Sequence, residues 1–184
     1  VEQVQQMRLA GLVVADALDA VRDALRPGVT TRELDALAHS VIRDAGATPS
    51  FLGYQGYPAT LCISVNDEVV HGIPGPRVIG EGDVVSVDCG AIVSGWHGDS
   101  AFTTVLPGAD GEIDAADQAL CDVTEAAMWH GIAAMSRGDR LVDIGGAIED
   151  LVESTPSTPS GTAPSGAGAS SYGLFEDYGG HGIG

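Results

Sequence analysis

Two strand-like runs on either side of Ser94-Gly95 constrain the fold of this chain more than any other feature of its sequence. They are DVVSVDCGAIV at 83–93 and WHGDSAFTTVL at 96–106, and both are rich in β-branched and apolar residues. A two-residue connection that ends in glycine is typical of a tight antiparallel hairpin. The sequence therefore predicts a β-hairpin centred on this dipeptide.

The hairpin decides which side chains share a face of the ribbon. Residues at equal distances from the centre of a two-residue loop face one another, so Asp88 should lie opposite Ala101 and Asp99 opposite Gly90. Asp88 and Asp99 then lie diagonally on one face, roughly 5–8 Å apart at Cβ. Both carboxylates should therefore be able to bind the same pair of cations.

A carboxylate in a strand as apolar as VVSVD is costly unless a cation neutralises it. An arginine partner is one solution, but neither strand contains an arginine. A pair of metal ions is the better one, because bridging carboxylates lose their mutual repulsion and hold a nucleophilic water. Oxygen ligands with an added imidazole suit Mn, Fe, Co or Zn. We therefore predict that Asp88 and Asp99 bind metal.

Helices are expected on both sides of the hairpin. Apolar residues recur at three-four spacing through 3–25, and Thr30 with Glu33 offers a capping box for a second helix. Further helices are predicted over 115–135 and 141–152, and 59–70 is β-rich.

A helix, a glycine turn and a helix occur twice, 110 residues apart, so that Gly28 matches Gly138 and Leu34 matches Ile144. Chance alignment of two amphipathic helix pairs is the alternative to a true repeat. The segment 154–171 is almost wholly Ser, Thr, Pro, Gly and Ala, which predicts a mobile loop.

Length and charge limit the class of protein. A chain of 184 residues suits one domain, and its net charge of −18 repels nucleic acid and anionic lipid. No run of about 18 apolar residues could span a membrane, and the first residues lack the features of a signal peptide. We expect a cytoplasmic protein. Cys62, Cys89 and Cys121 form no CxxC pair and should be reduced, mostly buried thiols.

Two of the five histidines are candidates for function. His71 stands in VVHGIP, between a strand and a turn, and His181 stands in GGHGIG, where flanking glycines leave the imidazole accessible. His97 shares the face of Asp99 and either orients a metal ligand or is a plain strand-edge residue. His39 and His130 should be surface or packing residues.

The four motifs VVHGIP (69–74), VDCG (87–90), HGDSAF (97–102) and GGHGIG (179–184), in this order, resemble the signature of type I methionine aminopeptidases. FLGYQGYPATLCISVNDEV at 51–69 resembles the same family, and the likeness covers nearly the whole chain apart from the Ser/Pro/Gly-rich insertion. The resemblance implies an α+β, pita-bread fold: a curved antiparallel sheet of two pseudo-symmetric halves with outer helices. We expect one catalytic domain over 1–184, with a first half at 1–110 and an incomplete second half at 111–184.

The resemblance also assigns roles to individual residues. Two divalent metal ions would be bound by Asp88, Asp99 and His181, with Asp99 bridging them. His71 would contact the amine and peptide of the substrate, and would help to position and protonate it. The pocket for a methionine side chain would be lined by Phe51, Tyr54, Tyr57 and Cys62, of which Phe51 is at a variable position of the family.

The implied activity is metal-dependent hydrolysis that removes an N-terminal methionine from proteins and peptides whose second residue is small. We expect a monomer able to act near the ribosome. The family's two glutamate ligands and a further histidine follow the GHGIG motif, and neither Glu176 nor Asp177 matches them, so residues 1–184 alone should be inactive. The alternatives are a non-catalytic binding module on the same scaffold and a hydrolase similar to aminopeptidase P.

Overall fold

The computed structural model describes residues 2–138, 140–156, 172–175 and 178–182. The chain divides into two compact units, the first built on the residues up to Ile113 and the second on Asp114–His181. Within the described ranges, no helix is long and apolar enough to cross a membrane.

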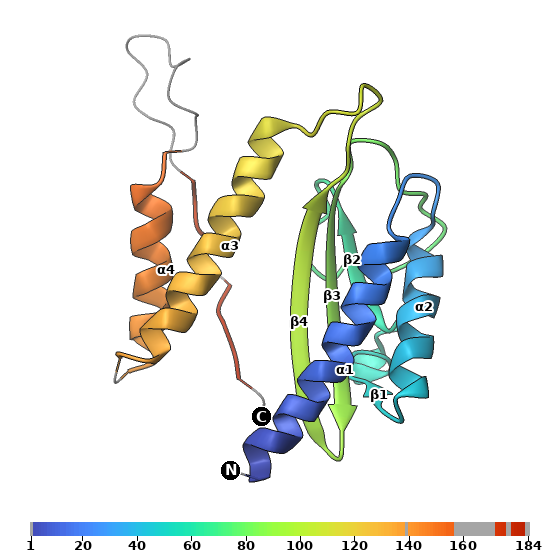
Figure 1. The fold of residues 1–184 in the computed structure, drawn as a ribbon, viewed down its shortest axis with the longest axis horizontal. Coiled ribbons are helices and arrows are strands. Elements are labelled where there is room, and N and C mark those ends of the chain that lie inside the picture. The colour runs from blue at the N-terminus through green and yellow to red at the C-terminus, as the bar shows by residue number, and fades with distance from the viewer. Residues whose placement is uncertain (1, 139, 157–171, 176–177, 183–184) are drawn as a thin grey trace. The chain divides into compact units, whose positions relative to one another are not determined.

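The first unit is an antiparallel sheet with two helices on one face (Figure 1). Strand β3 is central: it pairs with β4 on one side and with β2 and the two-residue β1 on the other. In chain order the elements are α1 (Glu2–Ala24), α2 (Thr31–Asp44), β1 (Thr48–Pro49), a 3-10 turn η1 (Tyr54–Gly56), β2 (Leu61–Val65), β3 (Val84–Val93) and β4 (Trp96–Val105).

The helix α2 begins at the capping box that the sequence predicts. The Glu33 backbone N–H donates to Thr30 Oγ1, and the Glu33 carboxylate accepts from the backbone N–H of Thr30 at 2.8 Å. Two backbone N–H groups that a helix start leaves unpaired are thereby satisfied. Leu34, Ala38 and Ile42 follow at helical spacing and are buried. Both predicted N-terminal helices are confirmed.

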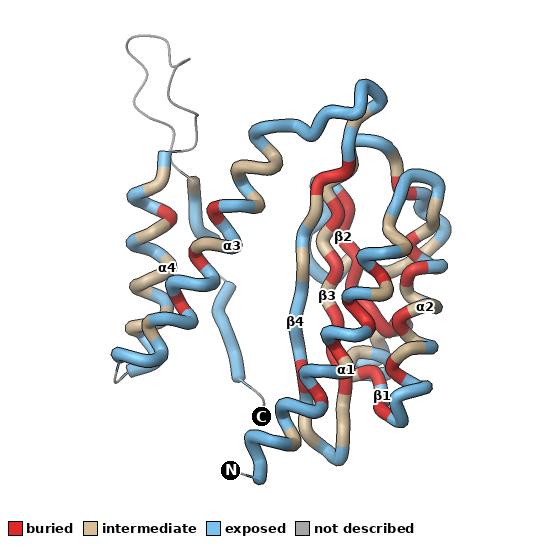
Figure 2. Tube along the Cα trace, viewed as in Figure 1, coloured by how far each residue is buried: buried red, intermediate tan, exposed pale blue. Residues whose placement is uncertain are grey.

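The hydrophobic core lies between the helices and the sheet (Figure 2). Alternate residues of β3 enter this core, which also takes in the inner faces of α1 and α2. The buried members from the strands include Leu61, Ile63, Val65, Val85, Val87, Cys89 and Ala91. The residues between these core members, Ser86, Asp88 and Gly90, therefore lie on the face away from the helices.

The hairpin has the predicted register throughout. Asp88 pairs with Ala101, Gly90 with Asp99, and the strands close at Val93 and Trp96. Ser94 has φ 51° and Gly95 has φ 83°, which are the two positive values that a tight hairpin turn needs.

The β-rich segment 59–70 is shorter as a strand than the sequence suggests, because β2 ends at Val65. Asn66 turns the chain with a left-handed φ of 59°, and its side chain bonds to Asp83 and to the backbone N–H of Val84. The Glu68 carboxylate accepts from the Val65 N–H. Side-chain hydrogen bonds of Asn66 and Glu68 thus replace the strand pairing that the apolar residues after Asn66 suggest.

The second unit contains the two predicted helices, α3 (Ala115–Met135) and α4 (Val142–Ser154), which pack against each other. Gly131 permits the contact, because a Cβ there would lie 3.0 Å from Ile148 Cδ1. Asp114 caps α3 through its carboxylate. Most of the predicted mobile loop, 157–171, lies outside the described residues.

The predicted repeat can be compared with the helix boundaries. The helices α1 and α3 end at Ala24 and Met135, and α2 and α4 begin at Thr31 and Val142, so the spacing recurs. Gly28 has a positive φ, whereas Gly138 is not among the residues with positive φ. The division into two related halves, 1–110 and 111–184, stays a prediction.

Candidate metal centre

The sheet brings Asp88 and Asp99 together on the face opposite the helices. Cys62 of β2, Asp88 of β3 and Ala101 of β4 form one row across three strands, and Gly90 opposite Asp99 lies in the neighbouring row. The two aspartates are therefore diagonal neighbours, as strand parity predicts. Asp88 is half-buried and Asp99 is exposed.

The environment of Asp88 disfavours its ionised form. Burial is the main cause that raises its pKa, to about 6, and the negative charge of Asp99 and a hydrogen bond between the two carboxyl groups raise it further. His71 lowers the pKa of Asp88 by a smaller amount. A cation bound by the two aspartates would remove their repulsion.

No arginine neutralises the pair within the described ranges, where the ion pairs are Arg77 with Glu68 and Arg140 with Asp143. In the same part of the chain, no three His, Cys, Asp or Glu side chains gather closely enough to hold a metal ion by themselves. The pair still fits a divalent ion in its chemistry, since two acidic oxygen donors share one face of the sheet and the charge of Asp99 raises the cost of ionising Asp88.

His71 occupies an unusual backbone conformation in the segment that follows β2. Its φ of 75° lies in the left-handed region, which costs a non-glycine residue roughly 1–2 kcal/mol. The side chain is exposed, and Gly72 follows it against β2. Strain of this kind persists only where surrounding contacts hold it, and such positions cluster at functional sites.

The four residues predicted to line the methionine pocket differ in position. Cys62 is buried beside Asp88, and Tyr57 is half-buried with its hydroxyl on backbone carbonyls. Phe51 packs over Gly90, where an added Cβ would lie 2.9 Å from its Cε1. Tyr54 is 67% exposed.

The pKa values of Cys62 and Tyr57 point to neutral groups. Burial raises the pKa of the Cys62 thiol, and a hydrogen bond with Tyr57 lowers it by less. Burial also raises the pKa of the Tyr57 hydroxyl. The protonated thiol and phenol offer an apolar, polarizable surface.

His97 and His39 make contacts outside the carboxylate pair. Nδ1 of His97 lies 3.1 Å from Oγ of Ser50, so the structure shows this imidazole bonded to the loop before Phe51. Nδ1 of His39 lies 2.9 Å from the Thr60 hydroxyl, which makes it a packing residue as expected.

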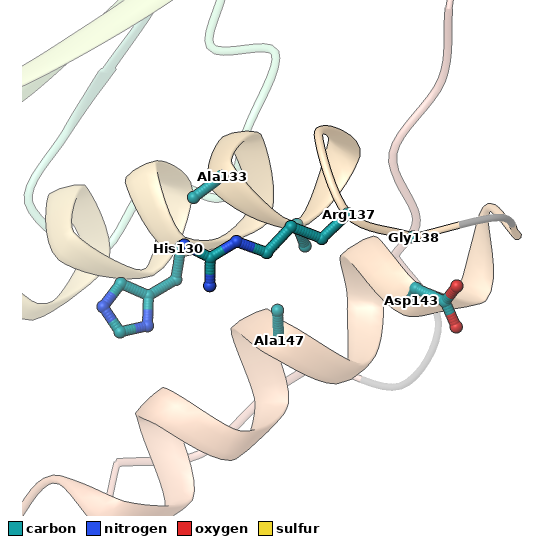
Figure 3. Close-up of a pocket in the computed structure, with 7 residues that line it drawn as sticks. His130, Ala133, Arg137, Gly138, Asp143 and Ala147 are labelled. Atoms are coloured by element: carbon teal, nitrogen blue, oxygen red, sulfur yellow. The ribbon is translucent and has the colours of Figure 1, made fainter.

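His181 is described as an exposed residue of the second unit, and its predicted role as a metal ligand stays a prediction. Glu176 and Asp177 lie outside the described residues. His130 is exposed and borders a hollow of about 500 Å³ between α3 and α4 (Figure 3). The carboxylate in that hollow, Asp143, pairs with Arg140, and none of its lining residues belongs to the predicted site.

Two polar residues near the site, Ser64 and Asp35, are neither metal ligands nor pocket-lining aromatic residues, and the sequence does not single them out. Ser64 accepts from the Gly72 N–H at 3.1 Å, and Asp35 accepts from the backbone N–H groups of Thr60 and Leu61. Strand parity could have placed Ser64 on the face of Cys62, since both are even-numbered residues of one strand. No local signal indicates Asp35, because its partners lie about 25 residues away along the chain.

The family model described as metallopeptidase family M24 matches residues 5–184. Methionine aminopeptidase 1 of Mycobacterium tuberculosis is 49% identical to this chain over 183 residues, which are 99% of the chain and 64% of that relative. Methionine aminopeptidase of Clostridium acetobutylicum is 42% identical over 99% of the chain and 66% of its own length. The crystal structure of methionine aminopeptidase from Thermotoga maritima matches with a TM-score of 0.78 at 37% identity, over 83% of this chain and 60% of that one.

The chain thus spans 64% and 66% of the length of these two curated relatives. The expected fold class, α+β with helices outside an antiparallel sheet, is confirmed by the structure and by the solved structure that it matches, which supports the pita-bread assignment. The names of the relatives do not favour a non-catalytic binding module or an aminopeptidase P-like hydrolase.

Proposed function

Because the chain belongs to the metallopeptidase family M24, we propose that the protein removes an N-terminal methionine from peptides and proteins by metal-dependent hydrolysis. One observation carries the proposal: two aspartates share the face of the sheet opposite the helices, each within a motif that resembles the methionine aminopeptidase signature. Relatives that bear this name are 42% and 49% identical to the chain.

Asp88 and Asp99 are the metal-binding residues of the first unit, and His181 is the third in the proposal. Two divalent ions, drawn from Co, Mn, Fe or Zn, would supply an acidified water and polarise the scissile carbonyl. The two carboxylates would supply the negative charge that neutralises the cations, and the cations would in turn favour the ionised form of Asp88.

His71 acts on the substrate in this proposal. Gly72, which follows His71, bonds to Ser64 of β2. Cys62 of the same strand pairs with Asp88, so a substrate bound at the carboxylate pair would lie near the His71 segment. A neutral imidazole can accept a proton from the substrate's ammonium group, and the imidazolium formed in this way can donate that proton to the leaving peptide nitrogen.

Phe51, Tyr54, Tyr57 and Cys62 form the proposed wall for the methionine side chain. Cys62 stands directly beside Asp88, so the apolar surface adjoins the carboxylates. A thioether binds well to aromatic rings and sulfur. We propose as substrates peptides with an N-terminal Met and a small second residue, and a cytoplasmic monomer that can work near the ribosome.

The test compares variants of the full-length protein. Asp99→Asn keeps the shape of the side chain but removes its charge, so metal affinity should fall roughly 100-fold or more and methionine release should be lost with it. Asp16→Asn, an exposed residue of α1, is the matched control and should leave both unchanged.

Metal affinity is measured by calorimetry. Release of the first residue is measured with Met-Gly peptides and with X-Pro peptides. Full metal affinity and full Met-Gly hydrolysis in Asp99→Asn would refute the assigned site. Preference for X-Pro over Met-Gly peptides would refute the assigned substrate.

A further inference from the structure

Gly72, the residue after His71, makes two hydrogen bonds to β2 and a third to Tyr57. The Gly72 carbonyl accepts from the Ile63 backbone N–H at 2.9 Å and from the Tyr57 hydroxyl at 3.1 Å. The Gly72 N–H donates to Ser64 Oγ at 3.1 Å. Both polar groups of one backbone residue are thus paired, and two of the three partner groups are side-chain hydroxyls.

The close contact with β2 leaves no room for a side chain at Gly72. A Cβ there would collide with the carbonyl oxygen of Ile63 and lie 3.0 Å from Cα of Ser64. Gly72 therefore packs closely against the backbone of β2, directly after the left-handed φ of His71. The direction of the His71 imidazole therefore depends on contacts made one residue later.

We propose that Tyr57 and Ser64 are positioning residues for His71: their hydroxyls clamp Gly72 and so hold the His71 segment against β2, the strand whose Cys62 pairs with Asp88. This inference rests on the proposed function, since it assigns the hydroxyl of Tyr57 a task separate from any contact of its ring with methionine.

The position of Tyr57 suits this task. Its hydroxyl lies 3.0 Å from the Leu61 carbonyl as well as 3.1 Å from that of Gly72, so it bridges the start of β2 to the His71 segment. Its own backbone is fixed, because its carbonyl accepts from Gly53 and its N–H donates to Tyr54. A bridge with both ends fixed restricts the His71 backbone more than one mobile contact would.

The closing experiment is a double-mutant cycle in the full-length protein with a Met-Gly peptide. Tyr57→Phe removes only the hydroxyl, so kcat should fall about ten-fold while KM stays within about two-fold, because the ring still meets the substrate. In a His71→Ala background, the same change should alter kcat by less than about two-fold, because nothing remains to be positioned.

Ser64→Ala should behave like Tyr57→Phe, and Ser64→Thr should restore most of the activity because it keeps a hydroxyl. Ser86→Ala is the control: it removes a hydroxyl on the same face that bonds to Thr103 rather than to Gly72, and it should leave kcat unchanged. Equal losses of kcat in the wild-type and His71→Ala backgrounds would overturn the proposal.

Hydrogen exchange at the Gly72 amide gives a reading that needs no activity. Ser64→Ala should accelerate it about ten-fold relative to Ser86→Ala. If exchange accelerates in a protein that never releases methionine, the proposed function fails and the clamp stands. Unchanged Gly72 exchange in Ser64→Ala shows that the clamp is absent, whatever the activity.

Discussion

Replacing Gly98 by alanine should destabilise the protein through a collision with helix α1. Gly98 is buried in β4 on the helix-facing side, opposite Ala91. A Cβ at this position would lie 2.6 Å from the carbonyl carbon of Ala10, 2.6 Å from the nitrogen of Gly11 and 2.7 Å from the Ala10 oxygen. All three are backbone atoms, so no rotamer change can relieve the contact.

The cost follows from the distance that the helix must move. Carbon atoms prefer separations of about 3.5–4.0 Å, so α1 would have to withdraw by about 1 Å from β4. Overpacking of this kind typically costs about 1–3 kcal/mol, and the loosened contacts of Ala10 and Val14 favour the upper part of that range. With a slope of about 2 kcal/mol per molar urea, the unfolding midpoint should fall by roughly 0.5–1.5 M.

The assay is urea unfolding followed by circular dichroism, with Gly11→Ala as the matched control. A Cβ on Gly11 meets nothing within 4 Å, and alanine is favoured over glycine inside a helix by about 1 kcal/mol. The control should therefore raise the midpoint while Gly98→Ala lowers it. A midpoint for Gly98→Ala equal to or above that of the wild type would refute the packing argument.

Two further stability predictions follow from the helix layer. The side-chain hydroxyl of Thr30 is the main cause that lowers the pKa of Glu33, so the ionised Glu33 carboxylate stabilises the protein above its ordinary pKa of 4.5. This contribution is lost as the pH falls through the lowered pKa. The difference in thermal stability between the wild type and Glu33→Gln should therefore shrink toward pH 3, and a difference that does not change with pH would contradict the argument. Leu34→Ala removes a side chain that is 1% exposed and should cost about 2–5 kcal/mol in urea unfolding, whereas Leu12→Ala, at 43% exposed, should cost far less; equal costs would contradict the assignment of the core.

The hairpin could be predicted residue by residue because strand geometry has a period of two and the loop has two residues. Those constraints alone place Asp88 beside Asp99, and the structure has the same register. The capping box of α2 could be predicted for a similar reason, since its partners are three residues apart. Structural features whose partners lie a few residues apart can therefore be predicted from the sequence.

The remaining parts of the site depend on contacts between distant segments. The strand β2 stops at Val65 because Asn66 bonds to Asp83, a partner 17 residues away. The bond from Tyr57 to Gly72 spans 15 residues, and no periodic pattern indicates it. Only the family resemblance assigns His181 to the same site as the two aspartates, and this assignment is a proposal.

The segment that follows β2 looks like an ordinary surface loop, with Val69, Val70 and Ile73 exposed. Its two ends are nevertheless fastened to different layers: Gly72 bonds to β2, while Gly75, Arg77 and Ile79 share backbone hydrogen bonds with residues 28–32 before and at the start of α2. A protein engineer choosing a site for a tag or an inserted domain would be misled by its exposure. Residues inserted here would alter how this segment connects the sheet to the helix pair, and His71 lies within the connecting segment.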